Sequence, residues 1–457
     1  MTRIPGDYTK ELIYVLLAFG VVARLLAASL GFTYDMESYE QVGRLVASGA
    51  NVYESTTRYN YGPVWFLVLG VLYKFSSFFP DPFAVLRFSI PFLLSFVDLG
   101  IFFFLRRFFG PAAAFIFYLN PLAIILTGYG SHFDNLAILA ALIAAYVYGK
   151  HGKRHTFRGK MAAFALLGLS LVVKHVFVAF PLWLAVRERE WKYRLLALFV
   201  PFGIFGLSFL PFVRSGLAGI IDNVFLYVSF KNAPLWHFFV LHGFPRIANE
   251  YVVFGVALLV GAVAFRKKPI VEALLLYTMT LVIFSVAIAD QYFSIVLPFI
   301  AVFPNVFFFL FTLLQMLYMW VVVSGGEVYA SFLGRMLDRP AIGYDWQLAL
   351  LFMGLAYALT GKRMQQWRAK HWIRFLVVSN VLFVFAILTP NYLENKKVTA
   401  IEQAIQRGDY EEANTFYSRI EKEAPLAGSR FWNKLTRSRF YIEHYREGVK
   451  EVLESKE

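Results

Sequence analysis

The sequence predicts an all-α polytopic membrane protein, and three observations lead to that fold class. Of the 457 residues, 59% are hydrophobic and only 16% are charged, against roughly 25% charged residues in an ordinary soluble domain. Apolar runs long enough to cross a bilayer recur along the chain. Lys and Arg concentrate in the short gaps between those runs. The composition therefore excludes a soluble globular protein and a disordered chain.

The net charge of +14 is best interpreted as a topology signal, so no nucleic-acid partner is expected. Membrane proteins place basic residues on the cytoplasmic side of the bilayer, and we assign the N-terminus and the basic gaps to that side. These gaps are 106–107, 150–160, 187–194, 266–268 and 362–374. The first apolar run lacks a small-residue cleavage site after it, which predicts an uncleaved first span.

An even number of membrane crossings must separate two basic gaps on the same side. This condition decides which apolar runs cross the bilayer. We expect about thirteen spans, at 11–31, 83–105, 110–128, 133–149, two within the hairpin 161–187, 194–213, 248–265, 269–289, two within 292–324, 343–361 and 371–389. The run 63–79 begins with Gly-Pro and contains Lys74. We expect it to lie in the membrane interface as a juxtamembrane helix within a large first outside loop, 32–86.

The chain divides into a membrane part, 1–390, and a soluble helical C-terminal segment, 391–457, which is rich in both basic and acidic residues. Within the C-terminal segment, AIEQAIQRGDYEEANTFYSRIEKEA has the helix-turn-helix pattern of one tetratricopeptide-like hairpin. Such folds need about three repeats. A plain helical appendage is therefore the favoured interpretation, with the tetratricopeptide-like hairpin as the alternative.

Polar residues in the first outside loop have no role in crossing the membrane. Asp35 and Glu37 directly follow the first span, where they can act in chemistry or simply suit the start of a helix as N-cap and first-turn acids. Arg58 and Tyr61 precede a Gly-Pro helix start. They are candidates for substrate binding, and the alternative is an interfacial anchor.

Later outside turns add further polar groups. His132 and Asp134 lie in the turn GYGSHFD, where the glycines and one capping residue explain the turn but not the histidine. Lys174 and His175 interrupt an apolar run. A cation within the bilayer costs about 2.5 to 3.5 kcal/mol unless it has a partner or reaches water, so Lys174 is a functional candidate, with snorkelling at a hairpin tip as the alternative.

Two further acidic positions differ in their expected roles. Gln291 and Tyr292 follow Asp290 ahead of a proline, and they form either part of the site or an interfacial anchor. Asp98 lies inside the second span, where a helix–helix hydrogen bond is the expected role. Together the outside groups place carboxylates, histidines and a lysine at one membrane face. That combination suits an anionic, lipid-borne substrate, with a carboxylate as general base and cations stabilising a phosphate leaving group.

The order of these groups resembles the GT-C glycosyltransferases, which use polyprenyl-phosphate sugars, and within them the mannosyltransferase-type members. The likeness covers about residues 8–300. It lies in the segments TYDMESYEQVGRLVASGANVYESTTRYNYGP, LNPLAIILTGYGSHFDNLAILAALIAAY, LLGLSLVVKHVFVAFPLWL and DQYFSIVLPF. They resemble the first loop of the family, its NP…G(H/Q)FD segment, its lysine hairpin and its late QYxxxxLP segment.

The resemblance implies a GT-C-like fold and roles for individual residues. Asp35 corresponds to the catalytic aspartate of the first loop, with Glu37 as the second acid of a D-x-D-like pair. His132, Asp134, Lys174, Gln291 and Tyr292 would line the substrate site. The acidic pair here reads D-M-E, and His175 stands where many relatives have Pro or a small residue. The family also implies inverting transfer without a metal or other cofactor.

The expected function is transfer of a sugar, with mannose the leading expectation, from a polyprenyl-phosphate donor to a lipid-linked or cell-surface glycan on the outer face. The N-terminus would be cytoplasmic, and the site and C-terminal segment outside. The alternative is a polytopic lipid or glycolipid transporter or flippase, whose usual internal repeats we do not find in the sequence. A scaffold that recruits partners through its C-terminal segment is a further alternative.

Overall fold

The computed structural model describes residues 10–29, 31–152, 156–227, 233–243, 249–324, 340–361 and 374–380. Every regular element within these ranges is helical, which confirms the predicted all-α class for this part of the chain. The C-terminal segment 391–457, with its tetratricopeptide-like stretch, lies outside the described residues.

The helices of the first half follow one another closely. They are α1 (Lys10–Ser29), α2 (Tyr34–Ala47), α3 (Val52–Ser55), α4 (Pro63–Ser76), α5 (Pro82–Phe109), α6 (Pro111–Tyr118), α7 (Pro121–Gly128), α8 (Asp134–Gly152), α9 (Phe157–Val173), η1 (His175–Phe177), α10 (Phe180–Arg187) and α11 (Trp191–Leu207). The second half holds η2 (Leu210–Phe212), α12 (Val213–Ile220), η3 (Ile221–Phe225), α13 (Pro234–Leu241), α14 (Glu250–Ala264), α15 (Ile270–Ile283), η4 (Asp290–Tyr292), α16 (Phe293–Val302), α17 (Val306–Ser324) and α19 (Pro340–Leu359).

Three helical stretches among the described residues are long and apolar enough to cross a membrane. They are α1, α5 and the stretch Trp191–Phe225, which runs from α11 to η3. The bent pair of α6 and α7 makes a fourth if it counts as one span, and several shorter apolar helices lie beside them. The expected number of about thirteen spans stays a prediction.

The run 110–128, expected as one span, is two helices that meet at an angle of 48°. The bend lies at Asn120-Pro121. The Asn120 side chain accepts a hydrogen bond from the backbone N–H of Leu122 (3.0 Å) and so starts a new helix, in which Pro121 occupies the first turn. Hydropathy alone does not reveal this break, because both halves are equally apolar.

The hairpin expected over 161–187 is present as α9, η1 and α10. At Lys174 the backbone becomes extended (φ −157°, ψ 131°), which ends α9. The buried ion pair between Lys160 of α9 and Glu188, just after α10, measures 2.6 Å. This pair joins the beginning of one arm to the end of the other, so Lys174 lies at the opposite, turning end.

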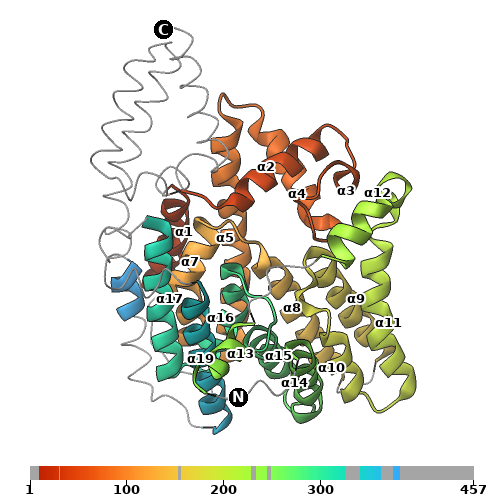
Figure 1. Cartoon of the computed structure of the whole chain (residues 1–457), viewed down its shortest axis with the longest axis vertical. Coiled ribbons are helices and arrows are strands. Elements are labelled where there is room, and N and C mark those ends of the chain that lie inside the picture. The colour runs from red at the N-terminus through yellow and green to blue at the C-terminus, as the bar shows by residue number, and fades with distance from the viewer. Residues whose placement is uncertain are drawn as a thin grey trace.

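Helices α2, α3 and α4 lie together at one end of the helical bundle, next to α12 (Figure 1). The crossing of α2 and α4 is close because glycines face it. A Cβ on Gly43 would come within 2.9 Å of the Leu69 carbonyl oxygen, and one on Gly70 within 2.2 Å of a Val46 methyl group. Helix α4 occupies the run for which the sequence predicted a juxtamembrane helix.

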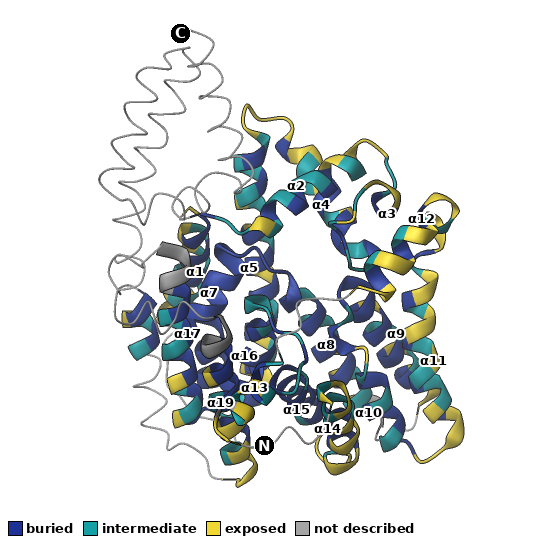
Figure 2. Ribbon diagram, viewed as in Figure 1, coloured by how far each residue is buried: buried dark blue, intermediate teal, exposed yellow. Residues whose placement is uncertain are grey.

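Exposed residues, yellow in Figure 2, lie on α11, α12 and α14, and many of them are apolar. Helix α14 carries Val252, Val256, Leu259 and Val260, each at least half exposed, and α11 carries Phe199 at 68% exposure. A surface of this composition suits contact with lipid tails, and it is unfavourable in water.

Candidate active site

Three turns separated by long stretches of sequence meet at the end of the bundle covered by α2 and α4. The first turn of α2 supplies Asp35, the α7–α8 turn supplies His132 and Asp134, and the α9–η1 break supplies Lys174. The Lys174 Nζ lies 2.7 Å from Asp134 Oδ2, and both side chains are almost completely buried. Asp134 Oδ1 accepts no hydrogen bond within the described residues.

Lys174 does not snorkel to the surface, because only 4% of the residue is exposed. Its ammonium group faces the rings of Tyr61 at 4.9 Å and Phe133 at 5.0 Å, both within range of a cation–π interaction. Phe133 also stacks on Trp65 of α4, with ring centroids 4.4 Å apart. The cation thus has an ionic partner and an aromatic enclosure, which offset its burial.

Asp35 faces this cluster from the first turn of α2. The N-cap of α2 is Thr33, so the alternative reading of Asp35 as the N-cap is wrong. About 40% of the Asp35 side chain is exposed, and its Oδ2 lies 3.6 Å from His132 Nδ1. Burial of the Asp35 carboxyl raises its pKa above the ordinary value, although the positive charges of Lys174 and Arg58 act to lower it. A raised pKa favours a carboxylate as a proton acceptor near neutral pH.

The two histidines of the site are neutral at pH 7. Burial lowers the pKa of His132 to about 4, despite the opposing effect of Asp134, and it lowers the pKa of His175 to about 4, with the charge of Lys174 adding to the effect. The contact between His132 and Asp35 is therefore no ion pair. Any interaction of these rings with an anion would use hydrogen bonds, since neither ring carries a positive charge.

The turn that presents His132 holds an unusual backbone conformation. Ser131 has φ of +52°, a conformation that a residue with a side chain adopts at a cost of roughly 1 to 3 kcal/mol. The turn is tied down by hydrogen bonds from His132 N–H to the Leu126 carbonyl (3.0 Å) and from the Thr33 hydroxyl to the Gly130 carbonyl (3.4 Å). The surrounding contacts thus maintain a strained turn next to Asp35.

Arg58 contributes a second cation from the segment between α3 and α4. Its guanidinium lies 3.9 Å from the centre of the Tyr34 ring, and its Nη2 lies 3.8 Å from Glu37 Oε2. That separation is too long for a hydrogen bond. The buried Nε and Nη2 atoms of Arg58 donate no hydrogen bond to any described residue. Unused donors of an arginine are well suited to a phosphate or carboxylate group.

Tyr61 connects the first loop to the cluster. Its carbonyl accepts a hydrogen bond from the Tyr53 hydroxyl (2.9 Å), and its ring contacts Phe133 edge to face with centroids 4.9 Å apart. Burial raises the pKa of Tyr61 well above its ordinary value, and Asp35, Asp134 and Tyr292 add to the increase. The phenol is therefore a hydrogen-bond donor at any pH at which the protein works.

Tyr292, the last residue of η4, is one of the groups that raise the pKa of Tyr61. Gln291 belongs to the same turn, and its carbonyl accepts a hydrogen bond from the Ser294 hydroxyl (2.7 Å). Among the residues that the structure describes, the Gln291 side chain forms no hydrogen bond or ion pair with another candidate residue. Asp290 accepts a hydrogen bond from Tyr344 of α19 (2.9 Å), which ties η4 to α19.

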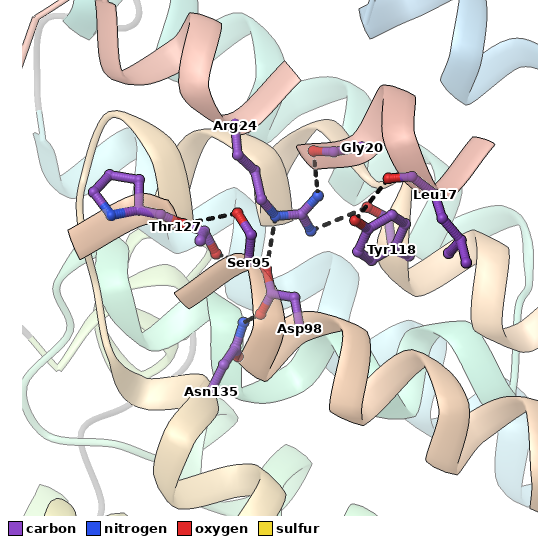
Figure 3. Close-up of polar contacts among 9 residues, drawn as sticks. Leu17, Gly20, Arg24, Ser95, Asp98, Tyr118, Thr127 and Asn135 are labelled. Carbon is purple, nitrogen blue, oxygen red and sulfur yellow. Dashed lines mark hydrogen bonds and ion pairs between the residues drawn. The ribbon is translucent and has the colours of Figure 1, made fainter. Parts of the chain in front are cut away.

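Asp98 makes the helix–helix hydrogen bonds that the sequence predicted, but its main partner is a cation that we did not expect. Arg24 of α1 donates from Nε to Asp98 Oδ2 at 2.8 Å, and both residues are fully buried (Figure 3). Arg24 interrupts the first apolar run as Lys174 interrupts a later one. The insertion cost that singled out Lys174 therefore applies equally to Arg24.

Among the residues that the structure describes, no group of three or more His, Asp or Glu side chains has an arrangement that could hold a metal ion. The expectation that the reaction needs no metal stays a prediction.

Comparisons with known proteins give a distant structural likeness. No family model matches the chain, and no curated protein matches it. Among solved structures, the chain is similar to the crystal structure of ArnT from Cupriavidus metallidurans bound to undecaprenyl phosphate, with 15% sequence identity and a TM-score of 0.43. The match covers 75% of this chain and 77% of that chain.

Proposed function

We propose that the chain is an integral membrane glycosyltransferase of the GT-C type, which transfers a sugar from a polyprenyl-phosphate donor. In this proposal the bundle crosses the bilayer about thirteen times, and the site opens on the outer face. The acceptor is a lipid-linked or cell-surface glycan, and mannose is the sugar we favour. The C-terminal segment is a helical appendage on the same face.

One observation supports the proposal most strongly. A carboxylate with a raised pKa, Asp35, is partly open to solvent next to an arginine with unused buried donors, Arg58. Asp35 is on α2, and Arg58 lies between α3 and α4. These helices form a layer at one end of the apolar bundle (Figure 1). A base beside an anion-binding group, at the end of a lipid-facing bundle, suits a substrate that has a phosphate head and an apolar tail.

The proposed reaction is a single displacement. Asp35 accepts the proton of an acceptor hydroxyl while the hydroxyl oxygen forms a bond to the anomeric carbon of the donor. The bond from that carbon to the phosphate oxygen breaks, and its electron pair leaves with the polyprenyl phosphate. Attack from the side opposite the leaving group inverts the anomeric configuration. No metal or other cofactor is required in this scheme.

The charges of the site suggest which group stabilises the departing phosphate. Lys174 is already paired with Asp134 at 2.7 Å, so the two charges largely cancel. Arg58 retains free donors and lies next to Glu37, which would hold the guanidinium in place. We therefore assign the main contact with the phosphate to Arg58, and we assign to Lys174 a supporting contribution to the electrostatic potential around Asp35.

The remaining candidates line the substrate in this proposal. His132, His175 and Tyr61 offer neutral ring N–H or O–H groups to sugar hydroxyls or to the phosphate. Asp134 has one oxygen, Oδ1, without a hydrogen bond within the described residues, and it is suited to accept from a sugar hydroxyl. Gln291 and Tyr292 would contact the substrate from η4.

The test is sugar transfer by the purified protein in lipid nanodiscs with labelled polyprenyl-phosphate sugars. Asp35→Asn keeps the size of the side chain but removes the base, so we expect transfer to fall by about 10²- to 10⁴-fold with expression and thermal unfolding unchanged. Asp35→Glu retains a carboxylate and should keep measurable activity. An Asp35→Asn protein with wild-type transfer would remove Asp35 from the mechanism.

A further inference from the structure

A buried polar network joins four helices beside the candidate site and takes no part in the proposed chemistry (Figure 3). Its centre is Asp98 of α5. Asp98 Oδ2 accepts hydrogen bonds from Arg24 Nε of α1 (2.8 Å) and from the Thr127 hydroxyl of α7 (2.9 Å). Asp98 Oδ1 accepts from Asn135 Nδ2 of α8 (2.6 Å). Each of the three donors belongs to a different helix.

Each of the three guanidinium nitrogens of Arg24 donates a hydrogen bond within the protein. Its Nη1 donates to the Gly20 carbonyl (2.9 Å) and its Nη2 to the Tyr118 carbonyl (3.1 Å), and the guanidinium also lies 4.4 Å from the centre of the Tyr118 ring. The donors of the network bond to Asp98 and to backbone carbonyls. Stability alone is a weak reason for such a network, because apolar side chains of similar volume usually replace a buried ion pair without loss.

The two neutral donors flank the turn that carries the candidate site residues. Thr127 is in the last turn of α7, one residue after Leu126, whose carbonyl accepts the hydrogen bond from His132 N–H. Asn135 directly follows Asp134, which binds Lys174. A shift of either donor would therefore move His132 or Asp134 relative to Lys174.

We infer that Asp98 is a positioning residue. It fixes Thr127 and Asn135, and through them the turn 129–133 and the first turn of α8, so that the Asp134 carboxylate meets the Lys174 ammonium. Arg24 orients the Asp98 carboxylate through its hydrogen bond to Oδ2. The inference rests on the proposed function only for its catalytic consequence, since the geometry can be tested without any substrate.

The test measures how readily the Lys174 amine reacts in the full-length protein. A small water-soluble N-hydroxysuccinimide ester acylates lysine amines, and peptide mass spectrometry gives the labelling of Lys174 relative to Lys160. Lys160 serves as an internal reference, because it is equally buried and paired with Glu188 at the opposite end of the hairpin. We expect Thr127→Val and Asn135→Ala to raise this ratio about fivefold, and, where transfer activity is measurable, to lower kcat/KM about tenfold.

Two further variants make the result decisive. Ser95→Ala removes a hydroxyl that bonds only within α5, to the Pro91 carbonyl (2.7 Å), and should leave the ratio unchanged. Asp134→Asn removes the partner of Lys174 and should give the largest increase. The inference is overturned if Asp134→Asn raises the ratio and the two network variants do not. It is also overturned if labelling of Lys160 rises in parallel in the network variants, because that result indicates general loosening of the fold. The same holds if Asp134→Asn leaves the ratio unchanged, because Asp134 then does not hold the Lys174 amine.

Discussion

Asp35 differs from the other carboxylates of the site in its exposure: 40% of its side chain is exposed, against 15% for Glu37 and none for Asp134. Asp134 is fully buried and its carboxylate is already paired with the Lys174 ammonium at 2.7 Å. Glu37 lies on the Arg58 side of α2. Among the three acids, Asp35 therefore has the geometry expected of a base that meets an incoming hydroxyl.

Burial raises the pKa of Asp35, and the charge of Arg58 opposes this increase. Removal of that charge should therefore change how the activity depends on pH. Asp35 must be ionised to accept a proton, so activity should fall as the pH decreases through a pKa above the ordinary 3.8. Arg58→Gln removes a positive neighbour and should shift this acid limb of kcat/KM to higher pH. The same change should raise KM for the donor by about 10- to 100-fold, because charged hydrogen bonds to the phosphate are lost. A pH–rate profile between pH 4 and 8 measures both effects.

Arg58→Lys is the matched control for that prediction. A lysine restores the positive charge but not the planar set of donors, so the acid limb should return towards its wild-type position while KM stays raised. An acid limb that does not move in Arg58→Gln would show that the two side chains are not coupled.

At the level of elements, the approach of α4 to α9 depends on Gly62. A Cβ at this position would lie 2.0 Å from the Val172 carbonyl oxygen, and the backbone on both sides cannot yield as a side chain can. We expect Gly62→Ala to lower the free energy of unfolding by about 1 to 3 kcal/mol and to reduce transfer, because the overlap displaces Tyr61 from Lys174. Thermal unfolding in detergent gives the first quantity.

Gly255→Ala is the comparison for Gly62→Ala. Nothing lies within 4 Å of a Cβ at Gly255 in the middle of α14, and alanine favours the helix by about 1 kcal/mol over glycine. This variant should be as stable as the wild type or more so. If Gly62→Ala behaves in the same way, the close contact between α4 and α9 is not present in solution.

The link between η4 and α19 predicts a second pH effect, on stability. Burial raises the pKa of Asp290 to about 6 from 3.8, although Tyr344 donates a hydrogen bond to it. Folding therefore favours the protonated form of Asp290. The contribution of this group to the free energy of unfolding is complete below pH 3.8 and is lost as the pH rises through about 6. Asp290→Asn should be more stable than the wild type by about 1 to 3 kcal/mol at pH 7.5 and nearly equal to it at pH 4.

Thermal unfolding at the two pH values measures this difference. Asp222→Asn, an exposed change on η3, should leave the pH dependence of the wild type intact. Equal destabilisation of Asp290→Asn at both pH values would contradict the account and point to a purely geometric role for the Asp290–Tyr344 contact.

The sequence predicted more about the elements than about how they meet. The Gly-Pro start predicted a helix where α4 lies, while its place in the membrane interface stays a prediction. The cost of a buried cation singled out Lys174. The pairing of Lys174 with Asp134 was not predictable, because 40 residues separate them and only the packing of α8 on α9 brings them together. Arg24 was missed although the same cost applies to it. The bend at Asn120 follows from capping, which hydropathy does not record.

At the scale of the whole molecule, the two ends of the bundle differ in character. One end carries α2, α4 and the polar cluster, and the other carries the Lys160–Glu188 pair beside the basic gap 187–194. This polarity agrees with the side that we assign to the basic residues. The arrangement therefore predicts that the candidate site faces away from the cytoplasm.

Cysteine labelling tests the sidedness, and the chain has no native cysteine to interfere. Ser77, at the end of α4, and Lys192, in the basic gap, are both exposed. In intact cells a membrane-impermeant maleimide should label Ser77→Cys, and it should label Lys192→Cys only after permeabilisation. The reverse pattern would place the candidate site on the cytoplasmic side.

The central claim is that the phosphate of a polyprenyl carrier binds between Asp35 and Arg58. An experimental structure of the protein in nanodiscs with added polyprenyl phosphate tests it most directly. We predict density for the phosphate within hydrogen-bond distance of the Arg58 guanidinium, on the side of the cluster that Asp35 faces, with the lipid chain along the apolar surface of the bundle. Phosphate density bound elsewhere, with Arg58 still contacting only Tyr34 and Glu37, would contradict the claim.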